Sequence, residues 1–221
     1  FIAGGSHPGF RSWEDALATQ PATPIADEAA GYDMVDAPVS GGIAAANGGT
    51  LTFMVGGSEE AFAAARPILE GMGKAVIHAG DAGAGQTAKI CNNMILGVSM
   101  IAISEAFVLG EKLGLSNQAL FDVASTASGQ CWALTTNCPV PGPVPTSPAN
   151  NDYKPGFAAA LMDKDLSLAA NALRDNGVDG VLGLQAAELY ARFKGESGGG
   201  TDVDFSGIIN DIRARSTGPN S

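Results

Sequence analysis

The spacing of apolar and polar residues changes character partway along the chain. Between residues 32 and 83, short runs rich in β-branched and aromatic residues end at Pro or at paired glycines. Such runs predict strands, and the amphipathic stretch that follows Ser58 predicts a helix with Ser58 as its N-cap and acids in its first turn. We expect strands at 32–38, 50–57 and 74–80, and a helix at 58–73.

Beyond residue 83 the pattern is helical. Residues 85–115 contain no Pro and are apolar on nearly every helical face, which predicts a helix buried in a large core or in an oligomer. A stretch with six prolines, 138–157, predicts an extended loop. Helical periodicity predicts further helices at 116–127, with Ser116 as a candidate N-cap, and at 159–177, 183–197 and 204–215. The predicted fold class is therefore α/β followed by all-α, with a boundary near Gly83.

Charge and composition argue against several classes of binding partner and site. The net charge of −11 argues against a nucleic-acid partner, because an acidic surface repels phosphate backbones. Three cysteines without C-x-x-C spacing and two histidines argue against a disulfide framework and a metal site, and His78 is expected to be structural. We expect no membrane span and no signal peptide, and hence a cytoplasmic protein.

One glycine-rich motif imitates a nucleotide site. Residues 83–88, GAGQTA, fit a loose G-x-G-x-x-A between a strand and a helix, with Glu105 about twenty residues further on. Glu105, however, falls inside the same predicted helix as the motif, so it cannot stand beside a ribose bound at Gly83. We interpret the motif as a tight strand-to-helix turn.

Two other segments are candidates for chemistry. Lys89 and Asn93 are four residues apart and share a helix face, where burial and the helix dipole lower the pKa of an ammonium group and favour proton exchange with a hydroxyl. The alternative is an exposed lysine on a buried helix. Ser40, Gly41 and Gly42 follow a strand and a Pro, and glycines let backbone N–H groups converge on a carboxylate. The alternative there is a tight loop without a ligand.

Four motifs together resemble the 3-hydroxyisobutyrate dehydrogenases of the β-hydroxyacid dehydrogenase family. They are DAPVSGG, GGTLTFMVGG, the long apolar helix and FAAALMDKDLSLA, and the resemblance covers about 31–213. It implies the back part of a Rossmann-type domain, 31–83, followed by a helical 6-phosphogluconate-dehydrogenase-like domain, 84–215, and a tail, 216–221. It also implies a homodimer or homotetramer.

The resemblance assigns roles to individual residues. Lys89 corresponds to the catalytic general acid or base, Asn93 to a substrate contact, and Ser40, Gly41 and Gly42 to the segment that binds the substrate carboxylate. Four further residues are considered. Lys164 would approach the cofactor, NAD, and Asp165 would orient that segment. Phe157 and Trp132 either wall the pocket or belong to the core.

The chain departs from the family at its start. The family's G-x-I-G-x-G-x-M-G turn, which cradles the cofactor pyrophosphate, has no clear counterpart, and residues 1–30 are irregular and unmatched. We therefore expect either an NAD-dependent 3-hydroxyisobutyrate dehydrogenase that lacks most of its cofactor domain, or a non-catalytic remnant that dimerises through its helices. We also expect the α/β part to be poorly ordered by itself, because a partial sheet leaves open edges.

Overall fold

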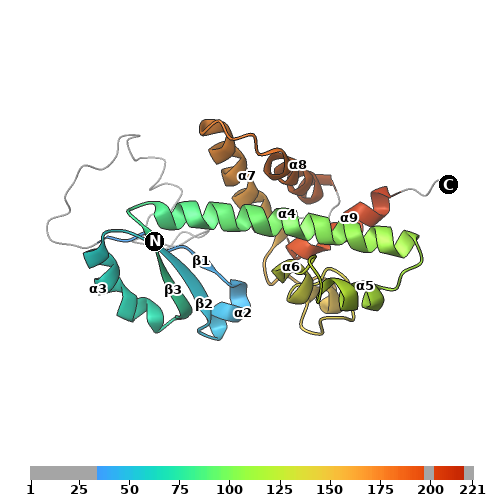
Figure 1. Ribbon diagram of the computed structural model, residues 1–221, viewed down its shortest axis with the longest axis horizontal. Helices are drawn as coiled ribbons and strands as arrows, with labels where there is room; N and C mark the ends of the chain where they lie inside the picture. The colour runs from blue at the N-terminus through green and yellow to red at the C-terminus, as the bar shows by residue number, and fades with distance from the viewer. Residues whose placement is uncertain (1–33, 197–201, 217–221) are drawn as a thin grey trace, which may run out of the picture. The chain divides into compact units, whose positions relative to one another are not determined.

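A small mixed sheet precedes the helices in the computed structural model, which describes residues 34–196 and 202–216 (Figure 1). Its strands are β1 (Val39–Ser40), β2 (Leu51–Gly56) and β3 (Gly73–Gly80), in the order β1-β2-β3. β1 pairs antiparallel to β2, with Val39 opposite Phe53, and β3 pairs parallel to β2. The crossover between the parallel strands is α3 (Glu59–Glu70).

Local capping signals were predicted correctly. The Ser58 hydroxyl accepts a hydrogen bond from Ala61 N at 3.2 Å at the start of α3, and Ser116 does the same for Ala119 N at the start of α5 (Asn117–Ala124). The strands predicted at 50–57 and 74–80 are confirmed as β2 and β3.

The segment around Pro38 differs from the prediction. Of the strand expected at 32–38, the described part makes one isolated bridge, Asp36 to Gly56, and β1 begins only after Pro38. Proline has no N–H to donate to a ladder, so pairing passes through the Pro38 carbonyl, which accepts from Met54 N at 3.0 Å. A short helix, α2 (Gly42–Asn47), follows and was not predicted.

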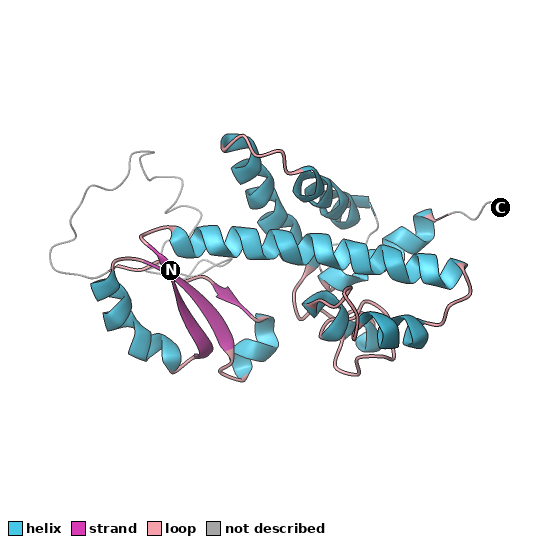
Figure 2. Ribbon diagram, viewed as in Figure 1, coloured by secondary structure: helices cyan, strands magenta, loops and turns pink. Residues whose placement is uncertain are grey.

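Among the described residues, helices account for most of the chain after Gly83, and strands β1 to β3 all lie before it (Figure 2). The long apolar segment is α4 (Ala84–Lys112), and it packs against β2, β3 and the helices that follow it. The remaining helices are α6 (Trp132–Thr135), α7 (Ala159–Asp175), α8 (Val181–Glu196), α9 (Ile208–Arg215) and the 3-10 turns η1 (Pro148–Asn151) and η2 (Phe205–Gly207).

The main core lies among α4, α7, α8 and α9. Met100, Phe107, Leu166, Tyr190 and Ile208 are all fully buried in one cluster. In the part of the chain that the structure describes, α4 is the single helix long and apolar enough to cross a membrane. Core helices of globular proteins pass the same test, and the packing of α4 on both sheet and helices is of that kind.

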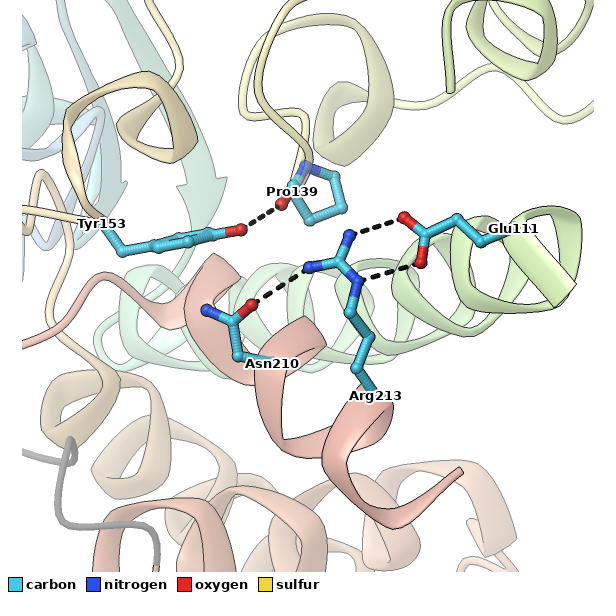
Figure 3. Close-up of polar contacts among 5 residues, drawn as sticks. All are labelled: Glu111, Pro139, Tyr153, Asn210 and Arg213. Carbon is cyan, nitrogen blue, oxygen red and sulfur yellow. Dashed lines mark hydrogen bonds and ion pairs between the residues drawn. The ribbon is translucent and has the colours of Figure 1, made fainter. Parts of the chain in front are cut away.

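A polar cluster fixes the far end of α4 (Figure 3). Arg213 donates from Nε and Nη2 to the two carboxylate oxygens of Glu111, at 3.0 and 2.7 Å. Its Nη1 donates to Asn210 at 3.0 Å. Tyr153 Oη donates to the Pro139 carbonyl at 2.8 Å in the proline-rich loop. The Arg213 guanidinium holds the pKa of the Glu111 carboxyl below its ordinary value. The pair therefore joins the end of α4 to α9.

Candidate active site

The N-terminal half of α4 meets the segment before β2 at Lys89. The Lys89 ammonium donates to the Val39 carbonyl at 2.7 Å, so it lies next to Ser40. The side chain is half-buried. Burial lowers the pKa of Lys89, nearby Lys164 lowers it further, and Asp165 opposes the shift. A lysine in such surroundings gives up its proton more readily than one in water.

Asp165 of α7 joins the other two predicted site residues. Its Oδ2 accepts a hydrogen bond from Asn93 Nδ2, and its Oδ1 forms an ion pair with Lys164 Nζ at 2.9 Å. Asn93 is 2% exposed, and its Oδ1 accepts from Asn92 at 3.0 Å. Lys164 is 62% exposed. Residues on helices α4 and α7 therefore form one polar group, although Asn93 and Asp165 are 72 positions apart along the chain.

A hollow of about 130 Å³ opens between α4 and α7. Lys89, Lys164 and Asp165 line it together with Pro38, Gln86, Ile90 and Leu168. Asn93 is buried and does not line the hollow, although it is hydrogen-bonded to Asp165, which does. The hollow is below the 300–1,000 Å³ typical of sites that enclose a drug-sized ligand, so it suits the reacting end of a small molecule.

Ser40, Gly41 and Gly42 form the end of β1 and the entry to α2. Gly41 and Gly42 have φ of 137° and 66°, backbone conformations that favour glycine. A Cβ built on Gly42 would lie 2.9 Å from the Gly156 carbonyl oxygen. The glycines expected here for their backbone freedom do use it, and the segment touches the loop before α7.

A buried carboxylate fixes that loop. Asp204 is 1% exposed and accepts from Gly156 N and Phe157 N, both at 3.0 Å, and from Asn137 and Ser206. Phe157 packs edge-on against Phe205, as a core residue does. Asp204 therefore sets the position of the backbone that faces Gly42.

The interpretation of GAGQTA as a simple turn is supported by the structure. Gly83 N and Gln86 N, which a pyrophosphate would use, donate instead to the two carboxylate oxygens of Asp36 at 2.6 and 2.8 Å. Glu105 lies within α4, in the same helix as the motif. No local pattern points to this role for Asp36, although the residue lies in the DAPVSGG motif.

Several secondary expectations can be placed in the structure. His78 lies in β3, stacks on Phe62 at 4.5 Å between ring centroids and contacts the Gly57 carbonyl at 2.8 Å, so it is structural. Trp132 is half-exposed, and neither it nor Phe157 lines the hollow. The three cysteines are free, and no cluster of metal-ligating side chains occurs among residues 34–196 and 202–216.

Two protein families match the chain. The family described as the NAD-binding domain of NADP-dependent 3-hydroxyisobutyrate dehydrogenase matches residues 83–212. The family described as the NAD-binding domain of 6-phosphogluconate dehydrogenase matches residues 17–80, of which 17–33 lie outside the described residues.

Individual relatives agree with these families. A probable 3-hydroxyisobutyrate dehydrogenase of Mycobacterium tuberculosis is 58% identical over 188 residues, which is 85% of this chain and 63% of that protein. The 3-hydroxyisobutyrate dehydrogenase of Pseudomonas aeruginosa is 47% identical over 197 residues, 87% of this chain and 65% of that protein.

A solved structure, Mycobacterium tuberculosis 3-hydroxyisobutyrate dehydrogenase with L-serine, matches with a TM-score of 0.77 at 59% identity. The match covers 81% of this chain and 60% of that one, so the chain spans under two thirds of the length of these relatives. The family match over residues 83–212, more than half of the chain, together with this solved structure, places this chain in the 3-hydroxyisobutyrate dehydrogenase family.

Proposed function

We propose that the chain carries out the NAD-dependent oxidation of 3-hydroxyisobutyrate to methylmalonate semialdehyde, a step in valine breakdown. The observation that carries the proposal is the half-buried Lys89, with its lowered pKa, in a hollow shared with Lys164 and Asp165. The L-serine named with the solved relative supports the substrate class. L-serine and 3-hydroxyisobutyrate share a carboxylate and a primary hydroxyl on the same three-carbon skeleton.

Lys89 acts as the general base in the oxidation. Its neutral amine takes the hydroxyl proton while the carbinol carbon loses a hydride and the carbon–oxygen double bond forms. In the reverse direction the ammonium form returns the proton. Because burial is the largest cause of the lowered pKa of Lys89, excluding water from the hollow shifts this pKa in the direction that favours the proton exchange.

The substrate carboxylate binds at Ser40, Gly41 and Gly42. The hydroxyl of the substrate then points toward Lys89, because Ser40 is adjacent to Val39 and the Val39 carbonyl accepts a hydrogen bond from Lys89. Asn93 contacts the substrate in this proposal. Its side chain already donates to Asp165, which also pairs with Lys164, so Asp165 orients both side chains.

The described residues fit one end of a dinucleotide. Lys164 supplies an exposed cation at the rim of the hollow, whereas the N-terminus of α4 is closed to phosphate by Asp36. The bound nicotinamide ring supplies the hydride acceptor. We also propose that the cofactor is NAD and not NADP. The boundary between the cofactor domain and the helical domain is proposed to lie near Gly83, with the domain ranges given in the sequence analysis.

The partner is proposed to be a second copy of the chain, in a cytoplasmic homodimer or homotetramer. A groove of about 880 Å³ lies among α4, α8 and α9, and large apolar side chains remain exposed on α4 and α8, including Ile95, Leu109, Val181 and Leu182. The second candidate function, a non-catalytic chain that only dimerises, rests on the same surface. A stable monomer in size-exclusion chromatography would contradict the proposed homodimer or homotetramer and also the non-catalytic dimer.

The test is turnover by the purified chain. NADH formation from 3-hydroxyisobutyrate is followed for the wild type, for Lys89→Met and for Lys74→Met, a matched exposed lysine on β3. We expect Lys89→Met to lower kcat by about 10²–10⁴-fold, the usual contribution of a general acid or base, and Lys74→Met to leave it unchanged. Equal rates in the two variants would overturn the role of Lys89, and no turnover by a folded wild type would favour the non-catalytic candidate.

A further inference from the structure

The start of α4 is capped by a carboxylate from a distant part of the chain. Asp36 accepts from Gly83 N at 2.6 Å and from Gln86 N at 2.8 Å, 47 and 50 positions away. The first N–H groups of a helix have no partners within the helix, and a cap normally comes from the residue just before it. Here the N-cap residue is Gly83, which has no side chain to offer.

The backbone of Asp36 is itself fixed to the sheet. Its N–H donates to the Gly56 carbonyl at 3.0 Å, and its carbonyl accepts from Gly56 N at 2.8 Å. Asp36 is therefore held by strand β2 through its backbone while its side chain holds α4.

Two glycines make the close approach possible. A Cβ on Gly56 would lie 2.3 Å from Asp36 Oδ1, and a Cβ on Gly85 would lie 2.6 Å from Asp36 Oδ2. Any side chain at either position would displace the carboxylate from the helix. The surroundings are thus fitted closely around Asp36.

Lys89 makes the return contact between the same two segments. It lies one helical turn after Gln86, and its ammonium donates to Val39, three residues after Asp36. Residues 36–39 and 83–89 are therefore joined in both directions, once by a carboxylate on backbone N–H groups and once by an ammonium on a backbone carbonyl. The charged groups that face Lys89 are Lys164 and Asp165, both from α7.

We propose that Asp36 is a positioning residue for Lys89, which rests on the function proposed above. Asp36 fixes the start of α4 against residues 36–40 so that the Lys89 ammonium lies beside Ser40. It touches neither the reacting carbon nor the transferred proton. Reaction rates depend steeply on such placement, since a displacement of about 1 Å can cost about 10²-fold.

The experiment compares loss of this cap with loss of an unrelated cap in the complete chain. Asp36→Asn replaces one acceptor oxygen by an NH2 group that faces an N–H donor. Ser58→Ala removes the cap of α3, which makes no contact with Lys89 in the described hydrogen bonds. The readout is the acetylation rate of individual lysines against pH, resolved by mass spectrometry, with Lys74 as the internal reference.

We expect Asp36→Asn to move the titration of Lys89 to higher pH, because a loosened helix start admits water to an ammonium whose pKa is lowered chiefly by burial. Ser58→Ala is expected to leave the titration of Lys89 in place, although it also lowers the melting temperature. Lys74, the internal reference, is expected to be acetylated at the same rate in all variants. If Asp36→Asn does not fold, Asp36→Ser, which also keeps one acceptor oxygen but turns no NH2 group toward an N–H donor, should give a shift of the same sign.

An unchanged Lys89 titration in a folded Asp36 variant overturns the proposal, as does an equal shift in Ser58→Ala. Because acetylation does not require turnover, the titration of Lys89 tests the role of Asp36 even if the wild type oxidises no hydroxy acid. A lack of turnover by the wild type would count against the proposed function alone. If the wild type is active, kcat of Asp36→Asn should fall by up to about 10²-fold while Ser58→Ala stays close to wild type.

Discussion

The contact between α4 and the sheet should be destabilised when a single methyl group is added at Gly85. A Cβ there would lie 2.3 Å from the Met54 carbonyl oxygen, 2.6 Å from Asp36 Oδ2 and 2.9 Å from the Asp36 carbonyl oxygen. Ordinary contact begins at 3.4 Å. Two of these atoms belong to the backbone and cannot rotate away, so the helix start must move back by the shortfall and weaken the Asp36 cap.

The size of the effect follows from two opposing terms. Overpacking of this kind costs about 3 kcal/mol at the upper end of its usual range, and replacing Gly by Ala within a helix gives back about 1 kcal/mol. We therefore expect Gly85→Ala to lower the free energy of unfolding by about 2 kcal/mol. Gly195→Ala in α8 is the control, because a Cβ there meets no atom within 4 Å, and it should leave stability unchanged or raise it.

Urea denaturation followed by circular dichroism measures both variants. The expected result is a lower midpoint for Gly85→Ala at an unchanged slope, which means lost stability without a change in the surface exposed on unfolding. A Gly85→Ala midpoint at or above that of Gly195→Ala would refute the close packing inferred between α4 and β2.

Three further predictions follow from other contacts. Glu111→Gln should cost about 1 kcal/mol near neutral pH, measured in urea, by breaking the paired hydrogen bonds from Arg213. Because the Arg213 hydrogen bond lowers the pKa of Glu111 in the folded state, the difference is fully present above the unfolded pKa and is lost as the pH falls through the lower folded pKa. Asp204→Asn should lower the free energy of unfolding by about 2–3 kcal/mol, measured in urea, because it turns an NH2 group toward buried donors, and an unchanged midpoint would contradict that. Gly42→Ala should cost about 1–2 kcal/mol from its φ of 66° and should raise KM for the hydroxy acid through its contact with Gly156, whereas an unaltered KM would separate this segment from substrate binding.

Local signals in the sequence predicted much of the fold. The hydroxyls of Ser58 and Ser116 lie three residues before the N–H groups they cap, so a short window reveals both. The length and apolar character of α4 were likewise visible in one continuous stretch. Helix α2 was missed, because its single Gly and its three alanines carry no amphipathic pattern and its start depends on Gly41 and Gly42 at positive φ.

The site was predicted only in part, and the reason is sequence separation. Spacing placed Lys89 and Asn93 on one helix face, but nothing in a local window shows that Asn93 binds Asp165, 72 positions away. The cap from Asp36 to Gly83 has the same character. Hydrogen bonds of this kind depend on how elements pack, so they emerge only once the sheet and α4 are placed together.

The apolar faces of α4 carry a similar lesson. The sequence predicted burial in a large core or in an oligomer, and Met100 and Phe107 are indeed buried while Ile95 and Leu109 are exposed. One face of the helix is thus explained by the core of a single chain. The other face is what the proposed oligomer would cover.

The measurement that tests the central claim most directly is a calorimetric titration of the 221-residue chain with NADH. The account predicts micromolar binding that weakens in Lys164→Met and is unchanged in Lys74→Met. A protein that is folded by circular dichroism and gives no heat of binding would contradict the claim that this chain holds a dinucleotide beside Lys89.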